Sequence, residues 1–353
     1  MNPFIYDVAA TRVVFGVGTL AALGEEAGHL GMKRAFVLST AAQAGTINAA
    51  AHALGEAFAG NFSEAAMHTP IAVTEKALEA ARANGADGLI SIGGGSAIGL
   101  GKALSLRTGL PHLVVPTTYA GSEMTPILGQ TENGVKTTMR DRAVQPAAVI
   151  YDVNLTLTLP TKMSGVSGLN AVAHAVEALY APDADPIIKL MAKEGIRVLA
   201  KSLPVVASTP GDKDARSDAL YGAWLCAVCL GRTSVALHHK LCHVLGGAFD
   251  LPHAETHAAV LPHAYAYNAP AVPETAAVLR EVLGSDQPAG VLFDLTASFG
   301  SPTALRDLGM PADGIDRALE LIFQNPYSNP RPLQRDAIRE LLENAWAGRR
   351  PQA

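Results

Sequence analysis

Buried strands alternate with helices over the first 150 residues, and strand signals end near residue 160. Short apolar runs at 34–39, 88–92 and 112–116 have the length and the β-branched content of strands buried on both faces. Strands of that kind occur in parallel sheets that helices cover on both sides. We therefore predict an α/β domain with a Rossmann-like parallel sheet at residues 1–160.

The order of elements follows from the positions of these runs. Thr74 is a candidate N-cap because its hydroxyl can accept a backbone N–H. Asn133-Gly134 is a favoured two-residue turn and predicts a hairpin over 127–135. Further strands are predicted at 11–15 and 147–152, and helices at 18–30, 46–57, 74–84 and 96–105.

Only the helical period remains from residue 161 to 353, so the second domain is predicted to be all-α. Cys226 and Cys229 form a C-x-x-C inside one helix, where core packing is favoured because no βαβ unit surrounds the pair. The predicted helices are 166–180, 186–202, 212–229, 234–246, 255–268, 272–283, 288–299, 303–307, 312–323 and 332–346.

Charge and hydropathy argue against several classes of protein. The net charge is −5 and no basic block occurs, so binding to nucleic acid or to an anionic membrane is not expected. The N-terminus lacks a basic region followed by an apolar one, and no apolar run reaches about 18 residues. We therefore expect a cytoplasmic protein with no membrane span.

Gly93, Gly94, Gly95 and Ser96 follow a predicted strand and open a predicted helix. Glycine lets a phosphate approach the backbone, and a helix start offers unpaired N–H groups at the positive end of its dipole. Ser96 can cap the helix or bond a phosphate oxygen. Such a turn alone is as compatible with a structural role as with nucleotide binding, because it is not the usual G-x-G-x-x-G fingerprint.

A second polar loop follows the next strand. Thr117, Thr118 and Ser122 crowd hydroxyls at the carboxyl end of the predicted sheet, where open α/β sheets bind ligands. Two such loops in succession favour nucleotide binding. Lys136, past the hairpin turn, is a candidate contact to ribose or phosphate and equally a solvated lysine.

Four of the eleven histidines lie in residues 237–253. If this stretch begins as a helix, His239 and His243 at i and i+4 share one face. Gly246-Gly247 suits a helix end, after which His253 can return toward that face. The sequence thus predicts a cluster of imidazoles.

A second helical pair, Asn170 and His174, lies upstream at the same spacing. Three imidazoles and an Asx side chain resemble a metal cage, except that the Asx group here is an amide. A divalent ion gains more from an anionic oxygen than from a neutral carbonyl. The pattern therefore leaves the presence of a metal open.

These motifs, in this order, resemble the iron-containing (group III) alcohol dehydrogenase family. They are Gly93-Gly-Gly-Ser96, Pro116-Thr-Thr-x-x-Gly-Ser-Glu123, Asn170-x-x-x-His174, His239-x-x-x-His243 and Pro252-His253. The resemblance covers nearly the whole chain. It implies a nucleotide-binding domain, an α-helical domain, a cleft between them, an architecture shared with dehydroquinate synthase, and a homodimer.

Within the family, the helix after Gly95 and the stretches 237–247 and 325–331 look most like the maleylacetate reductase branch. Members of that branch reduce maleylacetate to 3-oxoadipate with NADH or NADPH, in bacterial degradation of resorcinol-type and chlorinated aromatics. The resemblance therefore implies a nicotinamide cofactor and a small dicarboxylate substrate.

The family's four metal-ligand positions fall on Asn170, His174, His239 and His253, and its further histidine near the nicotinamide falls on His243. Metal-dependent members carry Asp where this chain has Asn170. The reductase branch generally works without metal, so no metal is expected.

NAD-selective members often carry Asp at the end of the second strand, near the adenosine ribose. The matching stretch here is Val37-Leu-Ser-Thr40, which holds no carboxylate. With no carboxylate to repel a 2′-phosphate, we expect weak discrimination between NADH and NADPH.

Candidate roles follow from side-chain chemistry. His243 is the first choice for proton donor or oxyanion stabiliser, because histidine titrates near neutral pH. His174, His239 and His253 would supply hydrogen-bond donors and carboxylate contacts, with Asn170 as a further substrate contact.

Two residues of the C-terminal loop are weaker candidates. Tyr327 would donate its hydroxyl to the ketone oxygen, and Arg331 would pair with a substrate carboxylate in bidentate fashion. For Tyr327, a packing role is as compatible with the sequence as a catalytic one. For Arg331, helix capping is as compatible as substrate binding. His238 and His257 receive no functional role.

Three other functions stay open. A metal-dependent alcohol dehydrogenase of the same family would reduce a carbonyl, and Asn170 disfavours it. A non-catalytic nucleotide-binding protein would leave the histidine cluster without a purpose. A dehydroquinate-synthase-like lyase would need a full metal site and more basic substrate contacts.

Overall fold

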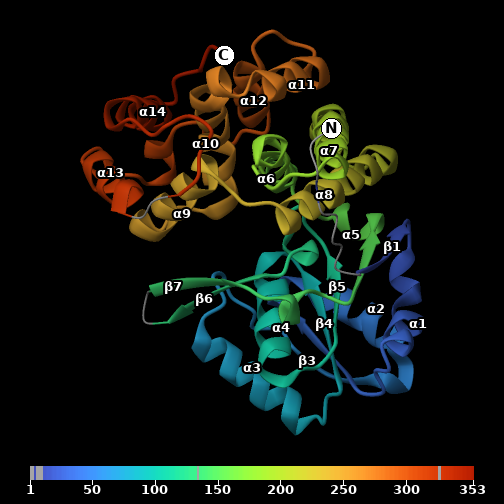
Figure 1. Ribbon diagram of the computed structural model, residues 1–353. Coiled ribbons are helices and arrows are strands. Elements are labelled where there is room, and N and C mark those ends of the chain that lie inside the picture. Colours follow the sequence, from blue (N-terminus) through green and yellow to red (C-terminus); the bar gives the residue numbers. More distant parts are fainter. Residues whose placement is uncertain (1–3, 5–10, 133–134, 325–326) are drawn as a thin grey trace. The chain divides into compact units, whose positions relative to one another are not determined.

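The computed structural model describes residues 4, 11–132, 135–324 and 327–353, and it divides into two compact units, Met1–Leu159 and Pro160–Ala353 (Figure 1). The first unit holds all the strands that the structure describes, and the second is built from helices. The predicted combination of a parallel-sheet domain with a helical domain is confirmed.

The first unit contains a six-stranded sheet in which every neighbouring pair is parallel. The order along the sheet is β1 (Arg12–Gly16), β8 (Ala148–Asp152), β5 (His112–Pro116), β4 (Gly88–Gly93), β2 (Ala35–Ser39) and β3 (Phe58–Phe62). Gly93 is paired with Pro116, so β4 and β5 end side by side. The two polar loops therefore leave the same edge of the sheet.

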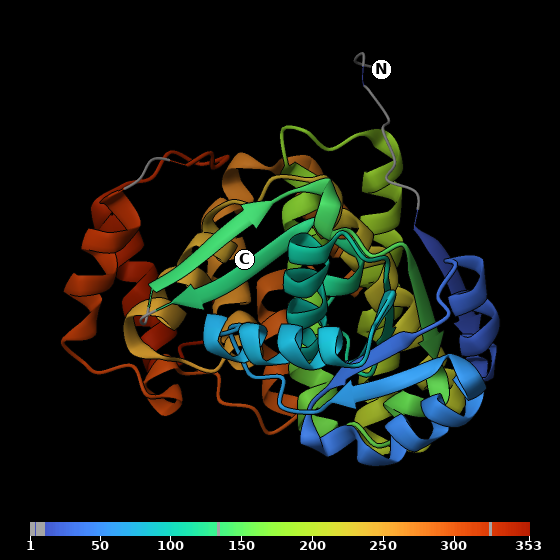
Figure 2. The same cartoon turned by 90° about the horizontal axis from the view of Figure 1, so that it is seen from below.

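Helices cover both faces of this sheet (Figure 2). On one face, Val37 and its neighbours pack against α1 (Leu23–His29) and α2 (Ala44–Leu54). On the other, Phe36 and Leu38 pack against α3 (Ile71–Ala83) and α4 (Gly95–Thr108). Successive strand residues point to opposite faces, which explains why the strands are apolar throughout.

Two details of the first unit differ from the predictions. β3 was missed because Gly60, with a φ of +144°, and Asn61 are weak strand formers. Thr74 is not the N-cap of α3, because the helix begins at Ile71 and its N-cap is Pro70. The Thr74 hydroxyl instead donates to the Pro70 carbonyl oxygen, 3.1 Å away.

The predicted hairpin is present and longer than expected. It consists of β6 (Ile127–Glu132) and β7 (Val135–Arg140), paired antiparallel. Leu128 packs with Ala103 of α4 and with Val144. The hairpin is thereby fixed to the helix that follows the glycine-rich turn.

The helices of the second unit match the predicted segments closely in number and order. Their described bounds are α6 (Thr161–Tyr180), α7 (Pro186–Ser208), α8 (Lys213–Arg232), α9 (Leu237–Phe249), α10 (His253–Asn268), α11 (Pro273–Leu283), α12 (Pro288–Ser298), η7 (Leu305–Leu308), α13 (Gly314–Gln324) and α14 (Arg335–Ala347). The prediction that Gly246-Gly247 ends α9 is wrong. The helix continues to Phe249 and ends at Asp250, which adopts the left-handed conformation.

Cys226 and Cys229 are buried within α8, as predicted for core residues. Burial raises the pKa of both thiols, so they are protonated at neutral pH. A Cβ atom on Gly195 of α7 would lie 2.7 Å from the Cys226 sulfur, which shows how closely the two helices pack.

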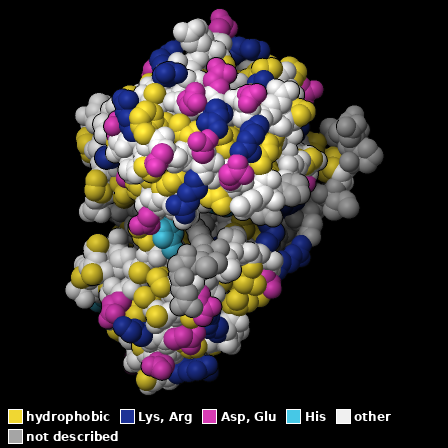
Figure 3. Space-filling model, turned by 90° about the vertical axis from the view of Figure 1, so that its left-hand side faces the viewer, with side chains coloured by type: hydrophobic (Ala, Val, Ile, Leu, Met, Phe, Trp, Pro, Cys, Tyr) yellow, Lys and Arg dark blue, Asp and Glu magenta, His cyan; other side chains and the backbone are white. Residues whose placement is uncertain are grey.

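Charged residues on the face shown in Figure 3 are mixed, with Lys and Arg interspersed among Asp and Glu. Exposed ion pairs among the described residues include Arg335 with Glu320 and Arg339 with Asp316. Among the described residues, no one helix has the length and apolarity to cross a membrane. The pair α8 and α9 meets that test only jointly, with a 91° bend between them.

Candidate active site

The glycine-rich turn at the end of β4 has a backbone that side chains would not tolerate. Gly93 has a φ of +144°, in the region that favours glycine. A Cβ atom on Gly94 would lie 2.9 Å from Thr118 Cγ2. The turn and the second polar loop therefore touch, as their common position at the carboxyl end of the sheet requires.

The start of α4 leaves backbone donors available. The N-cap is Gly94, so the prediction that Ser96 caps the helix is wrong, and Ser96 lies in the first turn. The first helical bond runs from Ile98 N to Gly94 O, so the N–H groups of Gly95, Ser96 and Ala97 have no partner within the helix. Such a helix start is suited to bind a phosphate.

The loop 117–127 is held in place by a lysine that the sequence analysis did not single out. The Lys102 ammonium group donates to the carbonyl oxygens of Ser122, Thr125 and Ile127 at 2.6–2.9 Å, and to the Thr125 hydroxyl. Burial lowers the pKa of Lys102 to about 7, although Glu123 opposes the shift. Lys102 thus fixes the loop that carries the predicted hydroxyls.

The structure shows fewer contacts for the other residues of the predicted cofactor site. Thr117 is buried, and its hydroxyl accepts a hydrogen bond from Gln43 Nε2 at 3.4 Å. Ser39, at the end of β2, is buried and bonds Ser63. The backbone of Lys136 lies in β7, but its side chain lies outside the part that the structure describes.

In the second unit, three helices bring the predicted histidines together. Asn170 and His174 lie on α6, His239 and His243 on α9, and His253 is the first residue of α10. Asn170, His174 and His239 are buried, with 2–4% of each residue exposed. The i, i+4 spacing places each pair on one helix face, as predicted.

A chain of hydrogen bonds joins His174, His239 and Glu177. His174 Nδ1 and His239 Nε2 lie 2.9 Å apart, and His239 Nδ1 lies 2.6 Å from Glu177 Oε2. The carboxylate also accepts the backbone N–H groups of Ala236 and His238, each at 2.8 Å. One buried acid therefore holds three donors, the His239 ring and two backbone N–H groups.

Glu177 stays ionised despite its burial. Burial alone would raise the pKa of this carboxyl, but His239 and the two backbone N–H groups outweigh it, so the pKa is lowered. The ionised carboxylate can only accept a hydrogen bond, so His239 Nδ1 carries the proton of that contact. The direction of the bond between His239 Nε2 and His174 Nδ1 depends on which of these two nitrogens carries a proton.

His243 and His253 differ from the buried histidines because both are exposed. The His243 ring lies 6.3 Å from that of His239, centroid to centroid, and the His253 ring lies 4.3 Å from that of His257. Among the predicted site histidines that the structure describes, these two are the exposed ones.

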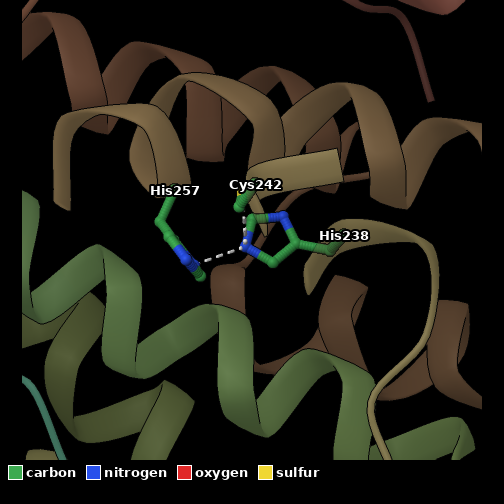
Figure 4. Close-up of side chains that lie close together, drawn as sticks. All are labelled: His238, Cys242 and His257. Atoms are coloured by element: carbon green, nitrogen blue, oxygen red, sulfur yellow. Dashed lines mark hydrogen bonds between the residues drawn. The ribbon is translucent and has the colours of Figure 1, made fainter. Parts of the chain in front are cut away.

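His238 and His257, which received no role from the sequence, lie inside the cluster. His238 Nε2 is 3.0 Å from His257 Nδ1 and 3.7 Å from the Cys242 sulfur (Figure 4). The residues lie on two helices, and only the packing of α9 against α10 brings them together. The i, i+4 spacing of His253 and His257 was the available sequence signal.

Tyr327 and Arg331 both pack against other residues of the second unit. The Tyr327 ring packs on the core of the second unit beneath Lys240 Nζ, 5.5 Å from the ring centroid. Its buried hydroxyl has no hydrogen-bond partner among the described residues. Arg331 stacks on the Tyr267 ring at 4.3 Å and donates one hydrogen bond to the Tyr267 carbonyl oxygen.

Asn329 fixes the segment between them. Its side chain exchanges hydrogen bonds with Asn268, at 2.7 and 3.1 Å, and accepts the Leu237 N–H at the start of α9. A pocket of about 120 Å³ opens beside it. The pocket is lined by Tyr180, Ala181, Pro182, Ser234, Val235, Ala236, Ser328, Asn329 and Pro330.

Comparison with known proteins defines the class. Residues 10–153 match the iron-containing alcohol dehydrogenase family, and residues 165–346 match the C-terminal part of the Fe-containing alcohol dehydrogenase family. The chain belongs to the iron-containing alcohol dehydrogenase family, which confirms the resemblance seen in the sequence.

Particular members of the family are similar over the full length. Maleylacetate reductase from Rhizobium sp. (strain MTP-10005) is 54% identical over 352 residues, which are 100% of both chains. That from Sphingobium indicum is 54% identical over 99% of each chain. The crystal structure of maleylacetate reductase from Agrobacterium tumefaciens, 55% identical, superimposes with a TM-score of 0.96 and covers 99% of this chain and 100% of its own.

The family name implies iron, and the residues present fit a divalent ion poorly. The four family positions offer one amide and three imidazoles, with no carboxylate. The adjacent carboxylate, Glu177, is occupied by His239 and backbone N–H groups. His174 Nδ1 and His239 Nε2 bond each other, and the buried Asn170 Oδ1 has no partner among the described residues.

Proposed function

We propose that this chain reduces the conjugated C=C bond of maleylacetate to give 3-oxoadipate, with a reduced nicotinamide nucleotide and without a metal. Identity of 54% over the full length with curated maleylacetate reductases supports the substrate. The reaction belongs to bacterial degradation of resorcinol-type or chlorinated aromatics.

The observation that carries the metal-free chemistry is the arrangement around Asn170. A neutral amide stands at the position where metal-dependent members carry Asp, and the two facing nitrogens of His174 and His239 are hydrogen-bonded to each other. Imidazoles fixed by Glu177 then do by hydrogen bonding what an ion does in relatives.

The reaction balances as follows. Hydride leaves the nicotinamide and adds to the alkene carbon β to the ketone, while the alkene electron pair moves toward the ketone oxygen as an enolate. A proton then adds to the α carbon. One NAD(P)H and one proton are consumed, and one NAD(P)⁺ and one 3-oxoadipate are formed.

His243 is the proposed proton donor or oxyanion stabiliser, because it is exposed and its ring stands beside that of His239. His253 is exposed as well and is proposed to contact a substrate carboxylate. His174 Nε2 and Asn170 would orient the substrate. His239, which is hydrogen-bonded to Glu177, would keep His174 in position.

Two weaker assignments remain proposals. Arg331 keeps guanidinium N–H groups beyond the one given to Tyr267, and these are proposed to bind the second carboxylate. The unpaired Tyr327 hydroxyl is proposed as a donor to the ketone oxygen.

Residues 1–160 are proposed as the dinucleotide-binding domain and 161–353 as the substrate domain. The diphosphate would bind the backbone donors of Gly95 and Ser96, with Thr117, Thr118, Ser122 and Lys136 as further contacts. Ser39 in place of an acid supports use of both NADH and NADPH. A kcat/KM preference for NADH above about a thousandfold would contradict this. Such a preference equals about 4 kcal/mol of discrimination, which requires a side chain that specifically rejects the 2′-phosphate.

We also propose that the enzyme works as a cytoplasmic homodimer. Light scattering after size exclusion would give twice the chain mass if this is right.

A substrate comparison tests the function itself. Purified protein is given NADH with maleylacetate, and separately with a panel of aldehydes and ketones, while the loss of reduced-nicotinamide absorbance is followed. We expect rapid oxidation of NADH with maleylacetate and formation of 3-oxoadipate. Turnover of simple carbonyl compounds without turnover of maleylacetate would favour an alcohol dehydrogenase instead.

A further inference from the structure

We infer that His238, Cys242 and His257 form a binding site for one thiophilic ion of the Zn²⁺ type, separate from the four family positions. The site uses none of Asn170, His174, His239 or His253. It goes beyond the proposed function, because binding at this site can be measured without any substrate.

The three ligand atoms converge in the structure. His238 Nε2 lies 3.0 Å from His257 Nδ1 and 3.7 Å from Cys242 Sγ, and all three atoms lie within 4.8 Å of one another (Figure 4). His238 and Cys242 are one turn apart on α9, and His257 comes from α10. Two well-packed helices therefore hold the donor set.

The distances suit a zinc ion closely. Zn–N bonds of about 2.0–2.1 Å and a Zn–S bond of about 2.3 Å in tetrahedral geometry place the ligand atoms about 3.3–3.5 Å apart. The nitrogen pair must open by a few tenths of an ångström, and the sulfur must move toward both nitrogens, from 3.7 Å for His238 Nε2 and from within 4.8 Å for His257 Nδ1. Side-chain rotations alone can supply shifts of that size.

The donor chemistry suits a soft or borderline ion. An imidazole binds an ion through the lone pair of an unprotonated ring nitrogen, and His238 and His257 each offer one nitrogen to the cluster. Burial raises the pKa of Cys242, so its thiol proton is released when sulfur binds the ion. One thiolate and two imidazoles leave a single net charge with Zn²⁺, and one coordination position stays open.

The second nitrogen of each ring makes no hydrogen bond to the described residues that would hold the ring in place. His238 Nδ1 and His257 Nε2 are buried and have no hydrogen-bond partner among the described residues. Buried polar groups without partners are uncommon in folded proteins. The pair is thus not fixed by outside hydrogen bonds, and its rings can turn to meet an ion.

An ion at this site would affect the reacting histidines. The His238 ring lies 5.2 Å from that of His239, and the His257 ring lies 4.3 Å from that of His253. Rotation of the His238 and His257 rings toward an ion would displace the neighbouring rings of His239 and His253. The site is therefore an inhibitory one, at which thiophilic ions slow the reductase.

Cobalt is the direct probe, because Co²⁺ replaces Zn²⁺ and gives a thiolate charge-transfer absorption band. The folded wild-type protein is freed of metal and titrated with Co²⁺ in the absence of nucleotide and substrate. We expect the band to saturate at one ion per chain and to be lost in Cys242→Ala. A band of the same strength in Cys242→Ala would overturn the proposal.

The other two cysteines provide a matched control. Cys226 and Cys229 are the only other thiols of the chain and are also buried. Cys226→Ala/Cys229→Ala should keep the band, and its loss there would assign the ion to the C-x-x-C pair and overturn the proposal. His257→Gln, which retains Cys242, should weaken Co²⁺ binding, so that the result does not depend on one variant.

Inhibition gives a second readout. Zn²⁺ should slow NADH oxidation by the wild-type protein and by the control double variant, with recovery on adding a chelator. Cys242→Ala should tolerate at least about tenfold more Zn²⁺, equivalent to 1.4 kcal/mol. Equal inhibition of all variants by Zn²⁺ would contradict the proposed site. If the protein shows no reductase activity, the proposed function fails, and the Co²⁺ titration still tests the metal site.

Discussion

Glu177→Gln removes the charge that orients His239 and changes little else in shape. One carboxylate oxygen accepts from His239 Nδ1 and Ala236 N, and the other from His238 N and the Tyr180 hydroxyl. Glutamine has a single oxygen, so its NH₂ group must face one of the two backbone N–H groups. One buried N–H loses its acceptor, which should lower the free energy of unfolding by about 1–3 kcal/mol.

The effect on catalysis follows from the same geometry. If the amide nitrogen faces His239, it donates to Nδ1 and reverses the proton between His239 and His174. If the amide oxygen faces His239, the bond loses its ionic partner and weakens. In the first case the His239 tautomer is reversed, and in the second it is held by a weaker bond. Changes to such supporting groups typically cost about 10–100-fold in activity.

The assay is steady-state oxidation of NADH with maleylacetate, together with urea unfolding. We expect kcat to fall by about 10–100-fold with little change in KM for NADH, because the loops proposed to bind the nucleotide belong to the first unit. Glu194→Gln is the control, since Glu194 is 38% exposed and pairs only at the surface with Arg197. An unchanged kcat in Glu177→Gln, at any stability, would refute the positioning role.

Three further predictions test other parts of the site. His243→Ala should lower kcat by about a hundredfold or more, whereas His52→Ala, an exposed histidine of α2, should not; assays of both variants at several pH values decide this. Asn170→Asp should bind Fe²⁺ that the wild-type protein releases on gel filtration, and elemental analysis showing no gain would contradict the role given to the amide. Lys102→Met should lower the free energy of unfolding by about 2–4 kcal/mol, because several carbonyl oxygens lose their donor. Burial lowers the pKa of Lys102 to about 7, so above that pH the unfolded chain binds more protons than the folded one. The free energy of unfolding of the wild-type protein, relative to that of Lys102→Met, should therefore rise between pH 7 and pH 10. Urea titrations measure this difference, and a difference that does not change with pH would contradict the prediction.

Much of the fold could be predicted because local signals and tertiary structure agree. Strands such as β4 and β5 are buried on both faces, so their apolar runs mark them without knowledge of their neighbours. β3 could not be predicted, because Gly60 and Asn61 form a strand only through pairing with β2. Helix ends were the least predictable, as α9 shows by continuing through Gly246-Gly247.

The site was predictable where its residues share one helix. Asn170 with His174 and His239 with His243 follow from i, i+4 spacing alone. Glu177 was missed although it lies one turn beyond His174, because its partner His239 is on another helix. His238 and His257 were missed for the same reason, and Lys102 because a buried lysine cannot be told from an exposed one by sequence.

The central claim is that fixed imidazoles, and no metal, support reduction of maleylacetate. The most direct test is the rate of NADH oxidation per chain after exhaustive chelation, with the metal content of the same sample measured. We predict that the full rate persists when bound metal is far below one ion per chain. A rate that falls with the metal content and returns on adding Fe²⁺ would contradict this account.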